Sequence, residues 1–224
     1  MHSLVWYVSA HGYGHAVRSA LVLDVLRRRA PTLALHVRAA APRWLFPPGV
    51  RYTELAADFG LAQHDSVTID FPGTLARAAA FRATWSARVA AEVDYLRQVN
   101  AALVVGDIPP LAFAAAAAAG LPAVGLTNFS WDWIYASYAA TWPEFAALAE
   151  AARATYRSAA LLLRLPFHGD LSVFPRRVDI PLVARVAPRP RTAYRRQLGL
   201  PLDRPCVLLS FGGIGLERFP YGRL

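Results

Sequence analysis

Two histidines and two glycines follow the first apolar segment of the chain. Residues 4–8 are apolar, and His11, Gly12, Gly14 and His15 come directly after them. In open α/β sheets, ligands bind beyond the carboxyl ends of the strands, where a glycine turn into a helix presents backbone amides. The helix dipole there disfavours an imidazolium, so we expect His15 to present a neutral ring that can act as a general base. For His11 a structural and a functional role are both open.

The glycines alone do not identify a ligand. Gly12 and Gly14 match only part of G-x-G-x-x-G, since valine stands at the third glycine position. A dinucleotide site also needs an acidic residue after the second strand, where residues 38–41 are Arg-Ala-Ala-Ala. A tight turn that requires positive φ explains the glycines equally well. A dinucleotide-dependent reductase is therefore a minor alternative. We expect no cofactor and, for lack of metal-ligand spacing, no metal site.

Asp107 ends a second apolar segment, residues 102–106. Two roles are open for its carboxylate. It can cap the helix that Pro109 and Pro110 open, because aspartate is favoured at helix N-caps. It can also orient His15 or an acceptor hydroxyl at the same edge of the sheet.

A segment rich in aromatic residues, 127–133, follows the apolar residues 122–126 and is predicted to be a loop. Aromatic rings beside Asn, Ser and Asp are typical of surfaces that contact carbohydrates. The same rings could form a small core beneath a loop. The candidates for ligand contact are Asn128, Trp131 and Asp132.

Apolar segments alternate with helical patterns over most of the chain, which predicts an α/β fold with a parallel sheet and helices on both faces. A long loop, residues 58–72, carries Asp65, Thr68 and Asp70, whose default explanation is solvated charge. The expected strands are 4–8, 33–38, 50–55, 102–106, 122–126, 159–163 and 178–183, and the expected helices are 15–29, 75–99, 110–120, 142–157 and 191–198.

Composition favours a soluble, cytoplasmic protein. The chain has 224 residues, of which 55% are hydrophobic, and a single cysteine. No apolar segment reaches the roughly 18 residues of a membrane span, and no signal-peptide pattern is present. The formal net charge is +9, carried by arginine without lysine. No basic stripe with stacking aromatics is evident, so nucleic-acid binding is not expected. The charge suits sugar phosphates or peripheral contact with anionic lipid headgroups.

The pattern of an apolar segment followed by a glycine-rich turn, first seen over residues 4–15, occurs again near the last residues. Apolar residues 206–209 run into a second glycine-rich turn, Ser210 to Gly215. We therefore expect a Rossmann-like domain over 1–186, a linker with a short helix over 187–204, and the start of a second, truncated Rossmann-like domain over 205–224. The chain is then expected to be a fragment.

Five segments together resemble the glycosyltransferase-like N-terminal region of plant-type L-arabinokinases and its stand-alone bacterial relatives. More distantly, the chain is similar to GT-B glycosyltransferases of the MurG and family 28 type. The segments are Tyr7–Ala16, Val104–Pro110, Leu126–Tyr135, Leu163–Pro166 and Asp179–Val183.

The resemblance implies a GT-B fold, in which one Rossmann-like domain binds an acceptor and a second binds a nucleotide-sugar. The implied reaction moves a sugar from the nucleotide-sugar to a hydroxyl of a carbohydrate or glycolipid. A non-catalytic domain that binds or senses carbohydrate is the alternative. By motif position, the catalytic residues would be His15 and Asp107, the acceptor side His11, Gly12, Gly14, Asn128, Trp131 and Asp132, and the donor loop Ser210, Gly212 and Gly213.

Overall fold

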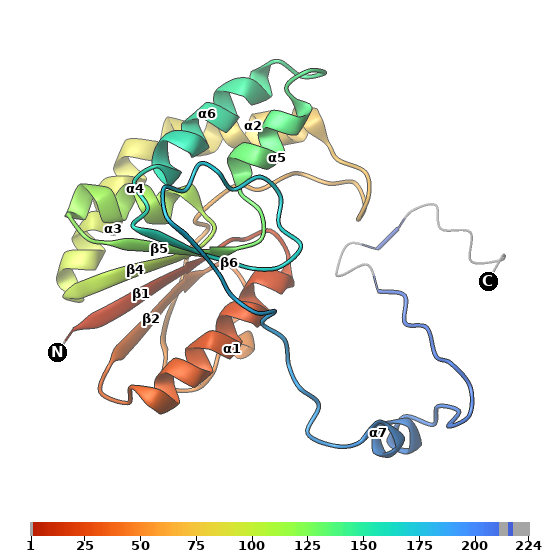
Figure 1. The fold of residues 1–224 in the computed structure, drawn as a ribbon. Helices are drawn as coiled ribbons and strands as arrows, with labels where there is room; N and C mark the ends of the chain where they lie inside the picture. The colour runs from red at the N-terminus through yellow and green to blue at the C-terminus, as the bar shows by residue number, and fades with distance from the viewer. Residues whose placement is uncertain (1, 211–214, 217–224) are drawn as a thin grey trace.

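The computed structural model describes residues 2–210, 215 and 216. Its centre is a seven-stranded parallel sheet in the order β3-β2-β1-β4-β5-β6-β7 (Figure 1). The predicted α/β fold with a parallel sheet is confirmed. The strands are β1 (Ser3–Val8), β2 (Ala34–Ala39), β3 (Arg51–Glu54), β4 (Ala101–Asp107), β5 (Ala123–Thr127), β6 (Leu161–Arg164) and β7 (Arg177–Asp179).

Helices cover both faces of the sheet (Figure 1). α1 packs on one face, and α2 to α6 form the layer on the other. None of the described helices is long and apolar enough to cross a membrane. The helices are α1 (Tyr13–Arg29), the 3₁₀ turn η1 (Arg43–Leu45), α2 (Phe71–Ala83), α3 (Trp85–Gln98), α4 (Pro110–Ala119), α5 (Trp131–Tyr138), α6 (Glu144–Tyr156) and α7 (Arg191–Gln197).

Side chains alternate along the strands, so the sheet builds two separate cores. In β1, Val5 and Tyr7 face the core beneath α2 to α6, whereas Leu4, Trp6 and Val8 face the core beneath α1. All six residues of β1 are buried, while β3 and β7 at the two edges are largely exposed. The central strands are therefore held from both sides, and their carboxyl ends are fixed in space.

The single helix expected over 75–99 is two helices, with a break at Thr84. The Thr84 hydroxyl donates to the carbonyl of Phe81 and accepts a hydrogen bond from Arg88 Nε. A β-branched hydroxyl residue that bonds to the backbone in this way competes with helix continuation. The helical periodicity of the flanking residues does not reveal this local competition.

The loop expected over 127–133 is shorter than predicted, because α5 begins at Trp131. Ser130 has extended backbone and precedes the helix, and Asp132 lies in its first turn. Trp131 and Tyr135 are four residues apart and are both buried, so they face the same core. Burial of these rings explains why the helix starts so early.

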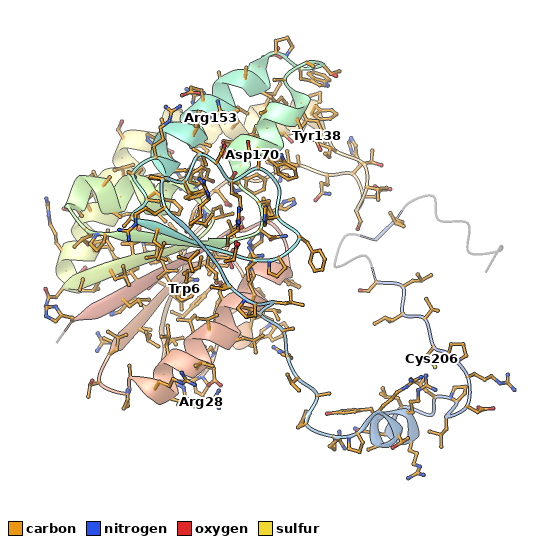
Figure 2. All side chains as sticks on the ribbon, in the orientation of Figure 1. Trp6, Arg28, Tyr138, Arg153, Asp170 and Cys206 are labelled. Atoms are coloured by element: carbon orange, nitrogen blue, oxygen red, sulfur yellow. The ribbon has the colours of Figure 1, made fainter. Side chains whose placement is uncertain are left out.

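Directly after β7 the chain still contacts the sheet, since the amide of Ile180 donates to the carbonyl of Arg164 and Ile180 and Val183 pack against the core beneath α1. The exposed segment that follows leads to α7, which lies apart from the sheet (Figure 1). Residues 206–210 are exposed and belong to no strand, so the prediction of a buried strand at 206–209 is wrong. A strand needs a partner for its backbone hydrogen bonds, and none of the described strands pairs with this segment. Cys206 lies in it, apart from the sheet (Figure 2). The division of the chain into domains stays a prediction.

Asp70 ends the long loop and caps α2, as its Oδ1 accepts a hydrogen bond of 2.9 Å from the amide of Gly73. A Cβ on Gly73 would lie 2.1 Å from Oδ2 of Asp70, so the glycine makes room for the cap. We predict that Asp70→Ala lowers the free energy of unfolding by about 1 kcal/mol. Denaturant unfolding measures this change. Asp70→Asn keeps the acceptor oxygen and should unfold like the parent; equal losses in both variants would contradict the capping role.

Candidate functional site at the carboxyl edge of the sheet

His15 and Asp107 meet as predicted. His15 lies in the first turn of α1, and Asp107 is the last residue of β4, paired with Val8 of β1. The His15 Nδ1 and Asp107 Oδ1 atoms are 2.8 Å apart. A carboxylate only accepts hydrogen bonds, so this contact is made by Nδ1–H, and in a neutral ring with that tautomer Nε2 carries the lone pair. Nη2 of Arg18 lies 2.9 Å from the same Nδ1. Among the described residues no hydrogen bond to Nε2 is found. Pro109 occupies the N-cap position of α4, so Asp107 does not cap that helix. Of the two roles open for its carboxylate, the contact with His15 is the one present.

Arg18 and Ser19 complete the environment of the Asp107 carboxylate. Arg18 donates from Nε to Oδ2 at 2.8 Å, its Nη2 contacts Oδ1, and the Ser19 hydroxyl donates to Oδ2 at 2.8 Å. Arg18 also donates from Nη1 to Oδ1 of Asn128 at 2.8 Å. Arg18 is not among the residues predicted for the site. Its spacing of three residues from His15, on the same side of a predicted helix, is the signal that indicates it.

The Asp107 carboxyl is fully buried and nevertheless ionised. Burial favours its neutral form and would raise its pKa, but the nearby His15 and Arg18 lower it, and the net effect is a pKa below the usual value. The His15 ring therefore lies between two opposite charges, the carboxylate of Asp107 and the guanidinium of Arg18. A carboxylate that holds an imidazole in this way is the arrangement of a histidine general base.

His11 lies beside this cluster. Its ring contacts Trp131 edge to face, with 5.4 Å between the ring centroids. Burial lowers the pKa of His11, the neighbouring His15 lowers it further, and Asp58 opposes both. Asp58, which the sequence analysis did not single out, accepts hydrogen bonds from the Ala10 amide at 3.1 Å and from Trp131 Nε1 at 2.9 Å.

Gly12 and Gly14 differ in whether their backbone conformation requires glycine. Gly12 has φ of +79° and precedes α1, so the interpretation as a tight turn that needs positive φ is confirmed. Gly14 lies inside the helix, and a Cβ on it would meet nothing within 4 Å. Gly14, Arg18 and Asn128 are among the residues that line an open pocket of about 450 Å³. This pocket adjoins the His15 cluster at the carboxyl edge.

Trp131 and Asp132 are not among the residues that line that pocket. Trp131 is 1% exposed and belongs to the core beneath α2 to α6. Asp132 Oδ2 lies 3.5 Å from Nε of Arg153, a residue of α6 (Figure 2). Burial raises the pKa of Asp132 above its usual value, although Ser130 and Arg153 lower it. The acceptor role given to these two residues stays a prediction, as does that of His11, Gly12, Gly14 and Asn128.

The predicted donor loop is only partly described. Ser210 is exposed and belongs to no helix or strand, and Gly212 and Gly213 lie outside the described residues. Within the described ranges, no group of three or more His, Cys, Asp or Glu side chains is placed to hold a metal ion.

Arg18 should contribute strongly to stability, because its loss leaves a buried carboxylate with fewer partners. We predict that Arg18→Met lowers the free energy of unfolding by about 3 kcal/mol. The depressed pKa of Asp107 supplies stability above its unfolded pKa of about 4, and this stability is lost as the pH falls through the folded pKa. Removing Arg18 raises the folded pKa, so acid unfolding should begin at higher pH.

Denaturant unfolding between about pH 3 and pH 7 measures both effects. Arg97→Met is the matched control, since Arg97 forms an exposed pair with Asp94 at 3.7 Å and should leave stability unchanged. A loss for Arg18→Met no larger than that of the control would refute the contribution of Arg18.

The comparisons with known proteins agree with this architecture. No protein-family model matches the sequence. The chain is 35% identical over 217 residues to L-arabinokinase of Arabidopsis thaliana, with 93% of this chain and 20% of that protein covered. The chain thus spans about a fifth of this curated relative. The resemblance seen in the motifs is confirmed.

Solved structures of glycosyltransferases share the fold. UGT2 of Phytolacca americana, solved with UDP-2-fluoro-glucose and pterostilbene, is 12% identical with a TM-score of 0.52, covering 83% of this chain and 55% of that one. UGT89C1 of Arabidopsis thaliana, solved with quercetin, is 13% identical with a TM-score of 0.51, covering 90% of this chain and 56% of that one. The chain is therefore similar in sequence to part of L-arabinokinase, and its fold is that of one Rossmann-like half of a GT-B glycosyltransferase.

Proposed function

We propose that this chain is the acceptor-binding half of a glycosyltransferase that moves a sugar from a nucleotide-sugar to a hydroxyl of a carbohydrate or glycolipid. The observation that carries the proposal is the buried pair of His15 and Asp107 at the carboxyl edge of β1 and β4. The GT-B-like fold supports it, since the Phytolacca enzyme was solved with a UDP-sugar analogue and a second small molecule.

The proposed reaction uses the free nitrogen of His15. Nε2 removes the proton of the acceptor hydroxyl, and the resulting oxygen forms a bond to the anomeric carbon of the donor sugar. The bond from that carbon to the diphosphate breaks, and the nucleotide leaves with the electron pair. Asp107 stabilises the imidazolium during this step and keeps Nδ1 protonated. The donor-side part, with Ser210, Gly212 and Gly213 near the diphosphate, is proposed from the motif alone.

A second function has support from the contacts of Arg18. This side chain already balances the charge of Asp107 and holds Asn128, so the cluster could serve to recognise sugar hydroxyls without chemistry. The chain would then be a non-catalytic domain that binds or senses carbohydrate. The two functions differ in what happens to a bound nucleotide-sugar.

We predict that His15→Gln lowers kcat by about 100-fold or more in a protein that joins this chain to a complete donor-binding half. Glutamine keeps a polar side chain but cannot take a proton. Turnover of UDP-sugars with a carbohydrate acceptor, followed by release of UDP, measures the effect. His168→Gln is the control, because His168 is exposed and its Nδ1 contacts only the carbonyl of Gly169 among the described atoms.

The outcomes separate the two functions. Loss of turnover in His15→Gln with unchanged UDP-sugar binding supports His15 as the general base. Unchanged turnover of His15→Gln would refute that assignment. Carbohydrate binding measured by calorimetry, with no transfer in the parent protein, would instead establish the binding domain.

A further inference from the structure

We propose that a cavity within the helical layer is a second binding site, for a small aromatic molecule that carries a hydroxyl group. The cavity has a volume of about 420 Å³ and lies between the α2–α3 junction on one side and α5 and α6 on the other. His15, Arg18, Asp107 and Asn128 are not among its lining residues. It therefore lies apart from the His15–Asp107 pair, and the inference does not depend on the proposed transfer reaction. Its lining includes Trp131, one of the residues predicted for the acceptor side.

The break at Thr84 shapes one wall of this cavity. Phe81 lies just before the break and Trp85 just after it, and both line the cavity. Arg88 donates to the Thr84 hydroxyl, and its guanidinium lies over the Phe81 ring, 4.3 Å from the centroid. These contacts hold the bend. A continuous helix would direct the two rings differently, so the wall depends on the break.

The opposite wall comes from small residues of α6. Ala151, Ala152 and Ala154 line the cavity, where larger side chains would fill it. The cavity is open to solvent, since Ala151 and Ala154 are exposed, as are Arg82 and Ser86 in the facing wall. A ligand that enters removes the apolar surface of the aromatic and alanine lining from water, which supplies the driving force for binding.

A row of aromatic rings in and beside the lining indicates that the ligand is aromatic. Neighbouring ring centroids in the row lie between 5.5 and 6.1 Å apart. Trp131 and Tyr135 are stacked, as are Tyr135 and Phe59. Aromatic ligands gain from offset stacking and edge-to-face contacts with such rings. The row runs in the order Trp85, Phe81, Phe59, Tyr135 and Trp131.

Asp58 supplies the polar contact. It is 4% exposed and lines the cavity together with the rings. Each of its oxygens accepts one hydrogen bond, from Ala10 and from Trp131, and keeps a further lone pair. Within the described chain no ion pair is found at this carboxylate, although Arg82 lines the same cavity. Asp58 can therefore accept a hydrogen bond from a ligand, and a neutral hydroxyl donates one without adding a charge to a lining that already holds Asp58 and Arg82.

Asp58 also connects the cavity to the turn that carries His11. The same carboxylate holds the Ala10 amide, and the His11 ring lies against Trp131. A ligand that contacts Asp58 and Trp131 should thus change the surroundings of the His11 ring. This offers a readout at a known position outside the cavity.

The test titrates the full chain with 2-naphthol and with 2-methoxynaphthalene, followed by NMR. We expect 2-naphthol to bind and to shift the His11 ring resonances. The methoxy compound has the same rings without the donor and should bind roughly tenfold more weakly. Equal affinity of the two compounds, or no binding of either, would overturn the proposal.

Two variants of α6 locate the binding. Ala154→Leu fills the cavity and should weaken 2-naphthol binding at least tenfold, while Ala147→Leu, on an exposed position of the same helix outside the lining, should leave it unchanged. Ala151→Leu fills the same cavity from another position and serves if Ala154→Leu does not fold. Binding that survives both filling variants, or that Ala147→Leu weakens equally, would contradict this site.

Discussion

The buried charge of Asp107 is the constraint on which the carboxyl edge of this fold depends. A carboxylate with no exposure to water must receive hydrogen bonds and opposite charge from the protein. Here His15, Arg18 and Ser19 provide them, all from the first two turns of α1. The helix therefore cannot slide or rotate over the sheet without breaking hydrogen bonds to the Asp107 carboxylate. The interaction that would orient a catalytic base is also what fixes the helix that carries it.

Much of the fold follows from patterns that any α/β protein would show. The apolar runs that become β1, β4 and β5 are buried on both faces, so their composition indicates them without reference to neighbours. The sequence patterns did not reveal where a side-chain hydroxyl ends a helix or where an apolar segment lacks a partner strand. The hydroxyl of Thr84 interrupts a periodic helical segment, and the residues expected to form a strand at 206–209 have no partner among the described strands. Both outcomes depend on contacts and not on periodicity.

The candidate site likewise contains residues that the sequence predicts and residues that it does not. His15 and Asp107 could be paired from the sequence because the carboxyl ends of adjacent parallel strands converge. The spacing of Arg18 from His15 indicates that the two share a helix face, but not that Arg18 bonds to Asp107. Asp58 could not be predicted, since its importance rests on the direction of its side chain. Trp131 lies in a segment whose composition is typical of a ligand-contacting loop at the carboxyl edge, but its ring belongs to the core beneath α2 to α6 and lines the cavity there. Composition alone does not distinguish an aromatic ring that meets a ligand from one that supports the site from below.

The order of strands has a consequence for where a ligand can lie. From β1 the chain proceeds to β2 and β3 on one side, and it then returns to place β4 against the other side of β1. In open α/β sheets, the segments that leave the strands on either side of such a topological switch point diverge and leave room for a ligand. His15 follows β1 and Asp107 ends β4, so the paired side chains lie at this point of the sheet. The connectivity therefore places the pair where such sheets bind ligands, whatever residues the adjoining loops contain.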